Sequence, residues 1–563
     1  MNPLLDFSDL PRFSDVRPEH VEPAMDQLIA EGREAIERLA TLKGAPTWET
    51  FVEPLDDANE RLGRAWSQAS HLNAVVNTPA LREAYNAALP KVTQFFAEQG
   101  QEPRLHAAFK ALAASPGFAQ WPEPRRRFVE NQLRDFRLSG AELAPADKAR
   151  FLEIQEELAK LGSRFQDNVL DATNAFGLYV TDRNELSGIP EDVLATAAGA
   201  AVKEGREGWK LTLHQPCYGP VMQYADHHGL RERMFKANFT RASELGPEKW
   251  DNGPLMRRIL ELREEGARLL GYKCHAEVSL APKMAESPAE VLQFLRDLAR
   301  RAKPFAERDM QQLREFARNE LNMAEVRACD VAYVGEKLRQ RRYAFSDQEV
   351  KQYFPEEAVL AGLFRVVGAI FGVTIREARA EAYHPEVRFH EVLDADGRRV
   401  GRFYLDLYAR EGKRGGAWMA QAVDRRRLGA RVQTPVTFLT CNFSAPVGGK
   451  PALFTHREVS TLFHEFGHGL HQLLTQVDEL GVSGLNGVEW DAVELPSQFM
   501  ENFIWQWDVV EPMTRHVDHG GRMPRALFDK LVAAKNFQSG MGFVRQIELG
   551  LFDMRLHLSL IHI

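Results

Sequence analysis

Two histidines and a glutamate lie close together in the sequence, at a spacing that suits a metal site. Residues 464–468 read His464-Glu465-Phe466-Gly467-His468, which has the pattern H-E-x-x-H. Because a helix turns by about 100° per residue, His468 returns to within about 40° of His464, and both imidazoles can reach one ion. Neutral imidazoles suit Zn²⁺, and a catalytic zinc site needs a third protein ligand and one open position. The segment therefore predicts two ligands of a zinc site.

The residues before this pattern predict the helix that would carry it. Thr455 and Glu458 form a capping box, which places a helix start just before an apolar series. This series comprises Val459, Leu462, Phe463, Phe466 and Leu470. H-E-x-x-H arises by chance in roughly a few per cent of chains this long, and isolated short matches mean little. Here the pattern lies on a capped helix between a strand-rich segment and a second acidic helix candidate, so a zinc site is favoured over chance.

The third ligand is expected among three acidic residues downstream. The segment Gly481 to Gln498 contains Glu489, Asp491 and Glu494. Asp491 and Glu494 would share one face of a helix, and a carboxylate near a zinc-bound histidine can accept its second ring N–H. The spacing alone leaves the choice of ligand open.

His471 is a further candidate beside the site. It follows His468 by three residues and lies near the same helical face, where it could donate to a neighbour of the metal. A histidine that is merely packed is the alternative interpretation.

Composition limits the class of protein. The chain has 563 residues, of which 44% are apolar and 27% charged. This balance is typical of globular proteins and excludes intrinsic disorder, and the length predicts at least two lobes. The formal net charge of −8 argues against general attraction to nucleic acid or to anionic membranes. We therefore expect that the protein binds neither nucleic acid nor membranes. We also expect it to be a monomer.

The cysteines and the N-terminus indicate a compartment. The four cysteines are far apart and form no C-x-x-C, so neither a thiolate zinc cluster nor a disulfide framework is expected. No secretory signal is visible near Met1, and no run of about 18 apolar residues could span a membrane. These features predict a cytoplasmic protein.

The first half of the chain reads as successive amphipathic helices. Apolar residues recur at helical intervals over Pro18 to Leu42, from Phe151 to Phe165, and over Ala285 to Phe316. We interpret these apolar stripes as core positions without chemistry.

A small sheet is expected just before the zinc helix. Val387 to Leu393 and Val400 to Tyr408 flank Asp396-Gly397, which predicts a β-hairpin, and Val436 to Phe443 reads as a third strand. Alternation in residues 403–408 predicts one packed face and one face toward solvent or a cleft. The glycine-rich segment 411–418 lacks the order of a phosphate-binding loop, and we interpret it as a mobile loop beside a cleft.

The segment from His464 to Asn502 resembles a known family of proteins. HEFGHGLHQLL from His464, followed by WDAVELPSQFMEN from Trp490, is similar to the M3 (thimet oligopeptidase-like) metallopeptidases. The likeness extends through nearly the whole chain, and further segments that carry it are SHLNAVVNTPALREAY from Ser70, NVLDATNAF from Asn168, YLDLYAREGKRGGAWM from Tyr404 and LTCNFSAPVGGKPALFTH from Leu439.

The resemblance implies a fold and a chemistry. It implies a mainly α, zincin-like fold with two helical lobes, a small antiparallel sheet beside the active-site helix and a deep channel that admits short peptides. We expect an N-terminal lobe over 1–200 and a catalytic lobe over 201–557. The implied zinc ligands are His464, His468 and Glu494, with Glu465 as the general base that acts on a zinc-activated water. Asp491 is our candidate for holding a zinc-binding histidine in place.

The end of the chain departs from the family. Gln546 to His557 still resembles it, but residues 558–563 do not, and we expect these last residues to be non-native. A natural variant that is shortened at this end is the alternative interpretation. The resemblance implies that a loop rich in glycine and tyrosine, which stabilises the oxyanion, belongs beyond this point. We therefore expect the catalytic lobe to be incomplete at its C-terminus, and loss of an oxyanion donor typically costs about 10²–10³ in rate.

Three functions follow as hypotheses. The first is a zinc endopeptidase that cleaves short oligopeptides. The second is a dipeptidyl carboxypeptidase of the same family. The third is a peptide-binding fragment without catalysis.

Overall fold

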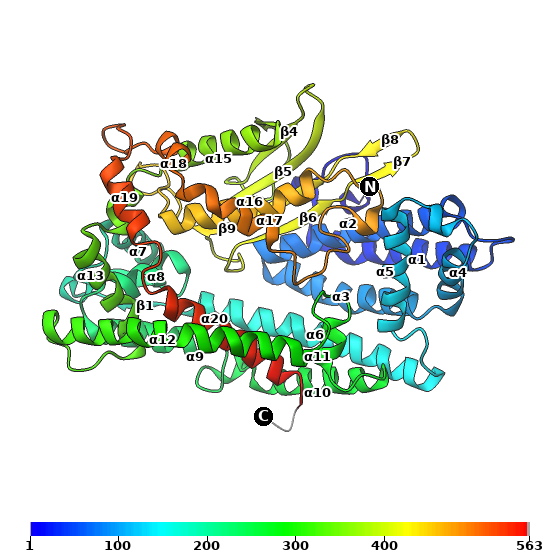
Figure 1. Ribbon diagram of the computed structural model, residues 1–563, viewed down its shortest axis with the longest axis horizontal. Helices are drawn as coiled ribbons and strands as arrows, with labels where there is room; N and C mark the ends of the chain where they lie inside the picture. The colour runs from blue at the N-terminus through cyan, green and yellow to red at the C-terminus, as the bar shows by residue number, and fades with distance from the viewer. Residues whose placement is uncertain (1, 560–563) are drawn as a thin grey trace.

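The computed structural model describes residues 2–559, which form a mainly helical protein with a small sheet (Figure 1). This confirms the expected fold class. The first fifteen helices are α1 (Pro18–Ala40), α2 (Glu53–Val75), α3 (Pro79–Gly100), α4 (Pro103–Ala113), α5 (Glu123–Leu138), α6 (Pro145–Ala175), α7 (Glu191–Lys203), α8 (Gln215–Tyr224), α9 (His228–Thr240), α10 (Gly253–Leu269), α11 (His275–Leu280), α12 (Pro288–Glu320), α13 (Val331–Tyr343), α14 (Asp347–Lys351) and α15 (Glu356–Phe371). The later helices are α16 (His456–Leu473), α17 (Leu495–Glu501), α18 (Trp507–Met513), α19 (Arg525–Ala533) and α20 (Ser539–Leu556).

The long helices α1, α6 and α12 confirm the three amphipathic segments predicted from the sequence. The predicted apolar stripe of α1 is buried along nearly its whole length, whereas those of α6 and α12 are less uniformly buried than expected. In α6, Phe151 and Ile154 are buried, but Phe165 lines a cavity. In α12, Leu292 is buried whereas Phe294 is 62% exposed. Helical spacing identified the side that packs, but not how far the packing extends along each helix.

Within residues 2–559, nine strands form one central sheet and two short antiparallel pairs, β1 with β2 and β7 with β8. The strands are β1 (Leu178–Val180), β2 (Trp209–Leu211), β3 (Thr374–Ala378), β4 (Arg388–Leu393), β5 (Arg399–Tyr408), β6 (Trp418–Val423), β7 (Arg426–Leu428), β8 (Arg431–Gln433) and β9 (Val436–Phe443). The central sheet has the order β3-β4-β5-β9-β6, and β6 is one of its edges.

The predicted hairpin and third strand are confirmed as β4, β5 and β9. The expectation of an antiparallel sheet is wrong for one pair, because β9 runs parallel to β5. The chain between these two strands forms β6, β7 and β8, and this long connection allows β9 to return beside β5 in the same direction. The sheet is therefore mixed.

Helices cover both faces of the central sheet (Figure 1). On one face Leu439 and Cys441 of β9 pack in the same core as α16, and on the other face Phe438 packs in the same core as α1, α2 and α3. Residues 403–408 are consequently buried throughout, which corrects the prediction of an open face. Asp406, whose polar side chain suggested that open face, is only 1% exposed because it is neutralised inside the protein.

The N-terminal helices share one core with the sheet. Buried residues as early as Leu4 and as late as Phe438 belong to the same cluster. The boundary expected near residue 200 remains a prediction, and so does the non-native tail, of which residues 560–563 lie outside the described residues. Among residues 2–559, none of the helices is both long enough and apolar enough to cross a membrane.

Candidate metal centre

Helix α16 carries both histidines of the H-E-x-x-H pattern. It begins at His456 after Thr455, whose side chain and that of Glu458 form the predicted capping box. The five apolar residues predicted for this helix are all buried against the sheet. Burial of this face leaves His464 and His468 on the opposite, partly exposed side of the helix.

The structure brings His464, His468 and Glu494 together. The Nε2 atoms of His464 and of His468 each lie 3.2 Å from Oε2 of Glu494. Bonds of about 2.0–2.1 Å to a tetrahedral zinc ion would place ligand atoms about 3.3 Å apart. Burial lowers the pKa of His468, which favours the neutral imidazole that binds a metal. The donor set and its spacing therefore fit a zinc ion.

Glu494 reaches this site from a separate segment. It immediately precedes α17 as its N-cap residue rather than lying within a helix. Oγ of the buried Ser497 lies 2.8 Å from Oε2 of Glu494 and orients the carboxylate. The Glu494 side chain is 51% exposed, so this side of the site is open to solvent, as a catalytic zinc site requires.

Close contact between α16 and α17 depends on Gly467. A Cβ atom at this position would lie 2.5 Å from Cα of Ser497 and 2.6 Å from the carbonyl oxygen of Pro496. Both atoms belong to the backbone, so a side chain cannot be accommodated by a simple rotation.

We expect Gly467→Ala to push α17 away from α16 and to weaken zinc binding at least tenfold, because Glu494 would move with α17. Competition with a chelator measures this affinity. Gly162→Ala is the matched control, since a Cβ there meets no atom within 4 Å and zinc affinity should not change. Equal zinc affinity in the two variants would contradict the role assigned to the contact.

Glu465 lies next to His464 and is buried, with only 6% of its surface exposed. Burial raises the pKa of this carboxyl to about 7, while His464 opposes the rise and Glu494 adds to it. A pKa near neutrality suits a group that must both accept and return a proton.

Glu501 is a site residue that the sequence reasoning missed. Its Oε1 lies 2.7 Å from Nδ1 of His464, which is the contact expected of Asp491. Asp491 instead accepts hydrogen bonds from the backbone N–H groups of Met284 and Ala285 at 3.0–3.1 Å. The expectation failed because Asp491 lies in a turn before α17, so helical spacing does not apply to it. Glu501 is seven residues after Glu494, and counting two helical turns forward would have found it.

We expect Glu501→Gln to weaken zinc affinity about 10- to 100-fold, because the carboxylate fixes the ring of His464 and raises its basicity as a ligand. The competition assay with a chelator measures the change. Asp491→Asn is the control and should leave the affinity unaltered. A larger effect of Asp491→Asn than of Glu501→Gln would reverse this assignment.

His471 lies beyond His468 on the same helix and is half-buried. Its Nδ1 atom is buried and has no hydrogen-bond partner among the described residues, and burial lowers its pKa. Its part in holding the metal ligands stays a prediction.

A second group of potential ligands is formed by His228, Cys329 and Asp330. The Asp330 carboxylate already accepts a hydrogen bond from Nη2 of the buried Arg231 at 2.7 Å. Because its charge is neutralised by a guanidinium, this group is a poorer metal site than the one on α16.

Comparisons with known proteins place the chain in a family. Residues 221–561 match the family described as peptidase family M3, and residues 25–148 match the N-terminal domain of neurolysin and thimet oligopeptidase. Oligopeptidase A of Escherichia coli is 48% identical over 99% of this chain and 82% of the relative. The dipeptidyl carboxypeptidase of Salmonella typhimurium is 32% identical over the same shares.

A solved structure supports the fold. A protein described as an oligoendopeptidase F from Bacillus anthracis matches with a TM-score of 0.54 and 15% identity, over 98% of this chain and 85% of that chain. At this identity the match shows the fold alone. The family match and the relatives together show that the chain is a metallopeptidase of family M3.

Proposed function

We propose that the chain is a zinc-dependent endopeptidase that hydrolyses peptide bonds in short oligopeptides. The observation that carries this proposal is the convergence of His464, His468 and Glu494 at 3.2 Å beside the buried Glu465. When bound to these three side chains, zinc would act as a Lewis acid that polarises a peptide carbonyl and activates water.

The chain's own residues supply the proton transfers. Glu465 would accept a proton from the attacking water and return it to the amine that leaves. Its pKa of about 7 supports both steps, because neither protonation state is strongly disfavoured near neutral pH. Glu501 would hold His464 in the tautomer whose Nε2 faces the metal.

Strand β6 supports the binding of extended peptides. It is an edge of the central sheet, and it contacts α16. An edge strand can pair with the backbone of a peptide, which fixes the peptide's register without demanding one particular side chain.

The test is cleavage of an oligopeptide that is blocked at both termini. We expect internal cleavage that stops when a chelator removes the metal and returns when zinc is added. Cleavage only of peptides with a free C-terminus, two residues at a time, would favour the dipeptidyl carboxypeptidase activity named for the Salmonella relative. Peptide binding without any cleavage would instead indicate a non-catalytic protein.

A further inference from the structure

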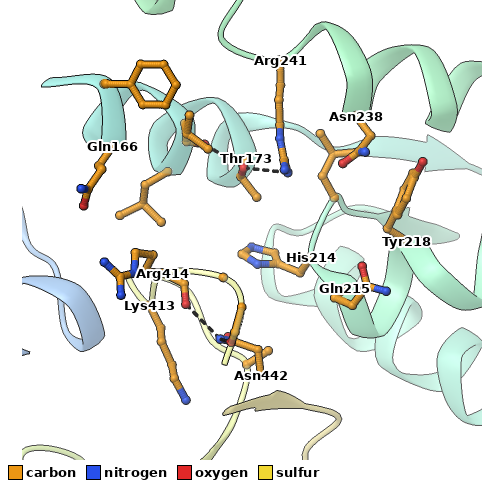
Figure 2. A pocket seen from close by; sticks show the side chains of 17 residues that line it. Gln166, Thr173, His214, Gln215, Tyr218, Asn238, Arg241, Lys413, Arg414 and Asn442 are labelled. Atoms are coloured by element: carbon orange, nitrogen blue, oxygen red, sulfur yellow. Dashed lines mark hydrogen bonds between the residues drawn. The ribbon is translucent and has the colours of Figure 1, made fainter. Parts of the chain in front are cut away.

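A cavity of about 490 Å³ lies outside the metal centre (Figure 2). Helices α6, α8 and α9 form part of its wall, together with Leu213 and His214 just before α8. The rest comes from residues 409 and 413–416 of the loop before β6 and from Asn442 of β9. None of its 17 lining residues is an aspartate or a glutamate. Three of them, Arg241, Lys413 and Arg414, are cationic side chains, so the charge of the wall is positive.

Arg241 points into the cavity from the end of α9 (Figure 2). Its Nη1 donates to Oγ1 of Thr173 at 3.3 Å, and it forms no ion pair within residues 2–559. Burial lowers the pKa of this guanidinium, because no carboxylate beside it compensates for the lost water. A guanidinium carries five N–H donors, so most of its hydrogen-bonding capacity remains available to a ligand.

Arg414 lies on the opposite wall, on the loop that the sequence led us to interpret as mobile. In the structure, hydrogen bonds from this loop to its neighbours hold it in place. The backbone N–H of Arg414 donates to the carbonyl oxygen of Ala74 at 2.8 Å, and Nδ2 of Asn442 donates to the Arg414 carbonyl oxygen at 2.9 Å. Its guanidinium lies 4.4 Å from the centre of the Trp418 ring and, like Arg241, forms no ion pair with any residue in the described part of the chain. The loop therefore presents a positioned, uncompensated cation.

The positive charge of the neighbouring Lys413, unlike that of Arg241 or Arg414, is neutralised by a carboxylate. The Lys413 side chain points away from the cavity (Figure 2), and its Nζ lies 2.7 Å from Oδ1 of the buried Asp406. His214 faces Arg241 across the cavity, and burial lowers its pKa against the opposing charge of Glu411. A neutral imidazole can still donate one N–H to an anion. The uncompensated charges of the wall are therefore those of Arg241 and Arg414.

We infer that this cavity binds a carboxylate of a peptide. Arg241 would hold the carboxylate, and Arg414 would add positive charge from the opposite end of the cavity (Figure 2). This inference rests on the proposed function, since peptides are the ligands that the metal centre would process. Guanidinium groups pair with carboxylates through parallel hydrogen bonds. The loop leads directly into β6, and Asn442 follows Cys441, which packs in the core of α16. A peptide that lies along β6 would therefore have its end near the arginines.

The carboxylate could be the peptide's C-terminus or an acidic side chain, and four acetylated peptides distinguish these sources. The first pair has one pentapeptide sequence without charged side chains, made once with a free C-terminus and once with an amidated C-terminus. In the second pair both peptides are amidated at the C-terminus, and they differ only in that one has an Asp residue where the other has Asn. Binding is measured by calorimetry in zinc-loaded Glu465→Gln protein, so that the result does not depend on turnover. Absence of cleavage by the wild type would overturn the proposed function, but would not alter this measurement.

We expect the carboxylate member of at least one pair to bind about 10- to 100-fold more tightly than its neutral partner. The double substitution Arg241→Gln and Arg414→Gln should abolish that difference, while the neutral peptides bind as before and so report an intact fold. Arg241→Lys with Arg414→Lys should keep part of the preference, and Arg545→Gln on α20 should keep all of it. Equal binding within both pairs, or a preference that survives the double Gln substitution, would overturn the inference.

Discussion

Glu465→Gln is expected to lower kcat about 10²- to 10⁴-fold while the protein keeps its zinc. The substitution retains the shape of the side chain but removes the group that would accept a proton from water. Glu465 is not among the three side chains whose ligand atoms converge, so metal affinity should not depend on its charge. Steady-state cleavage of the doubly blocked peptide measures kcat, and metal analysis after gel filtration measures zinc content.

Glu494→Gln provides the contrast to this variant. It changes a carboxylate of similar shape only 3.2 Å from two imidazoles, and we expect it to lose zinc as well as activity. Loss of zinc from Glu465→Gln, or full zinc content in Glu494→Gln, would show that the roles of ligand and base have been assigned to the wrong residues.

Asp406→Ala is expected to lower the free energy of unfolding by about 3–5 kcal/mol. The Asp406 carboxylate is 1% exposed and accepts hydrogen bonds from Nζ of Lys413 and from both Nη atoms of Arg410, each at 2.7 Å. Without the aspartate, the buried Lys413 ammonium would have no counter-charge. Urea unfolding followed by fluorescence measures the loss. The control is Asp529→Ala, because Asp529 pairs with Arg525 at the surface, where removal should cost less than about 1 kcal/mol.

The stabilisation by Asp406 is expected to decrease as the pH falls. Burial would raise the pKa of Asp406, but the hydrogen bonds and charges of Arg410 and Lys413 outweigh it, and the pKa lies below the ordinary value. The stabilisation is therefore fully present above the pKa of an unfolded aspartate, and it is lost as the pH falls through the lowered value. The difference in stability between wild type and Asp406→Ala should shrink in acid, and a difference that grows in acid would contradict this account.

The sequence predicted most of the metal centre because its ligands follow local rules. The capping box at Thr455 and the four-residue spacing of His464 and His468 depend only on helix geometry, and both are present as expected. Spacing could not choose Glu494 over its acidic neighbours, because the segment before α17 is a turn. That choice came from resemblance to the family, and the structure brings Glu494 to both imidazoles.

The sheet was harder to predict because its burial is decided by distant segments. An alternating strand with an aspartate indicated one open face, yet α2 and α16 cover the two sides of the sheet. The charge on Asp406 is tolerated because Arg410 and Lys413 fold back onto it, and no periodic pattern reveals such a pairing.

The core shared by the N-terminal helices and the sheet has a consequence for how the protein is made. Oγ of Ser67 in α2 donates to the backbone carbonyl of Gln421 in β6, 354 residues later. At about 5–20 residues per second, a ribosome needs roughly 20–70 s to add that stretch. During this time the apolar side of α1, α2 and α3 has no sheet to pack against. Newly synthesised chains should therefore expose this surface to chaperones and proteases until β9 has left the ribosome.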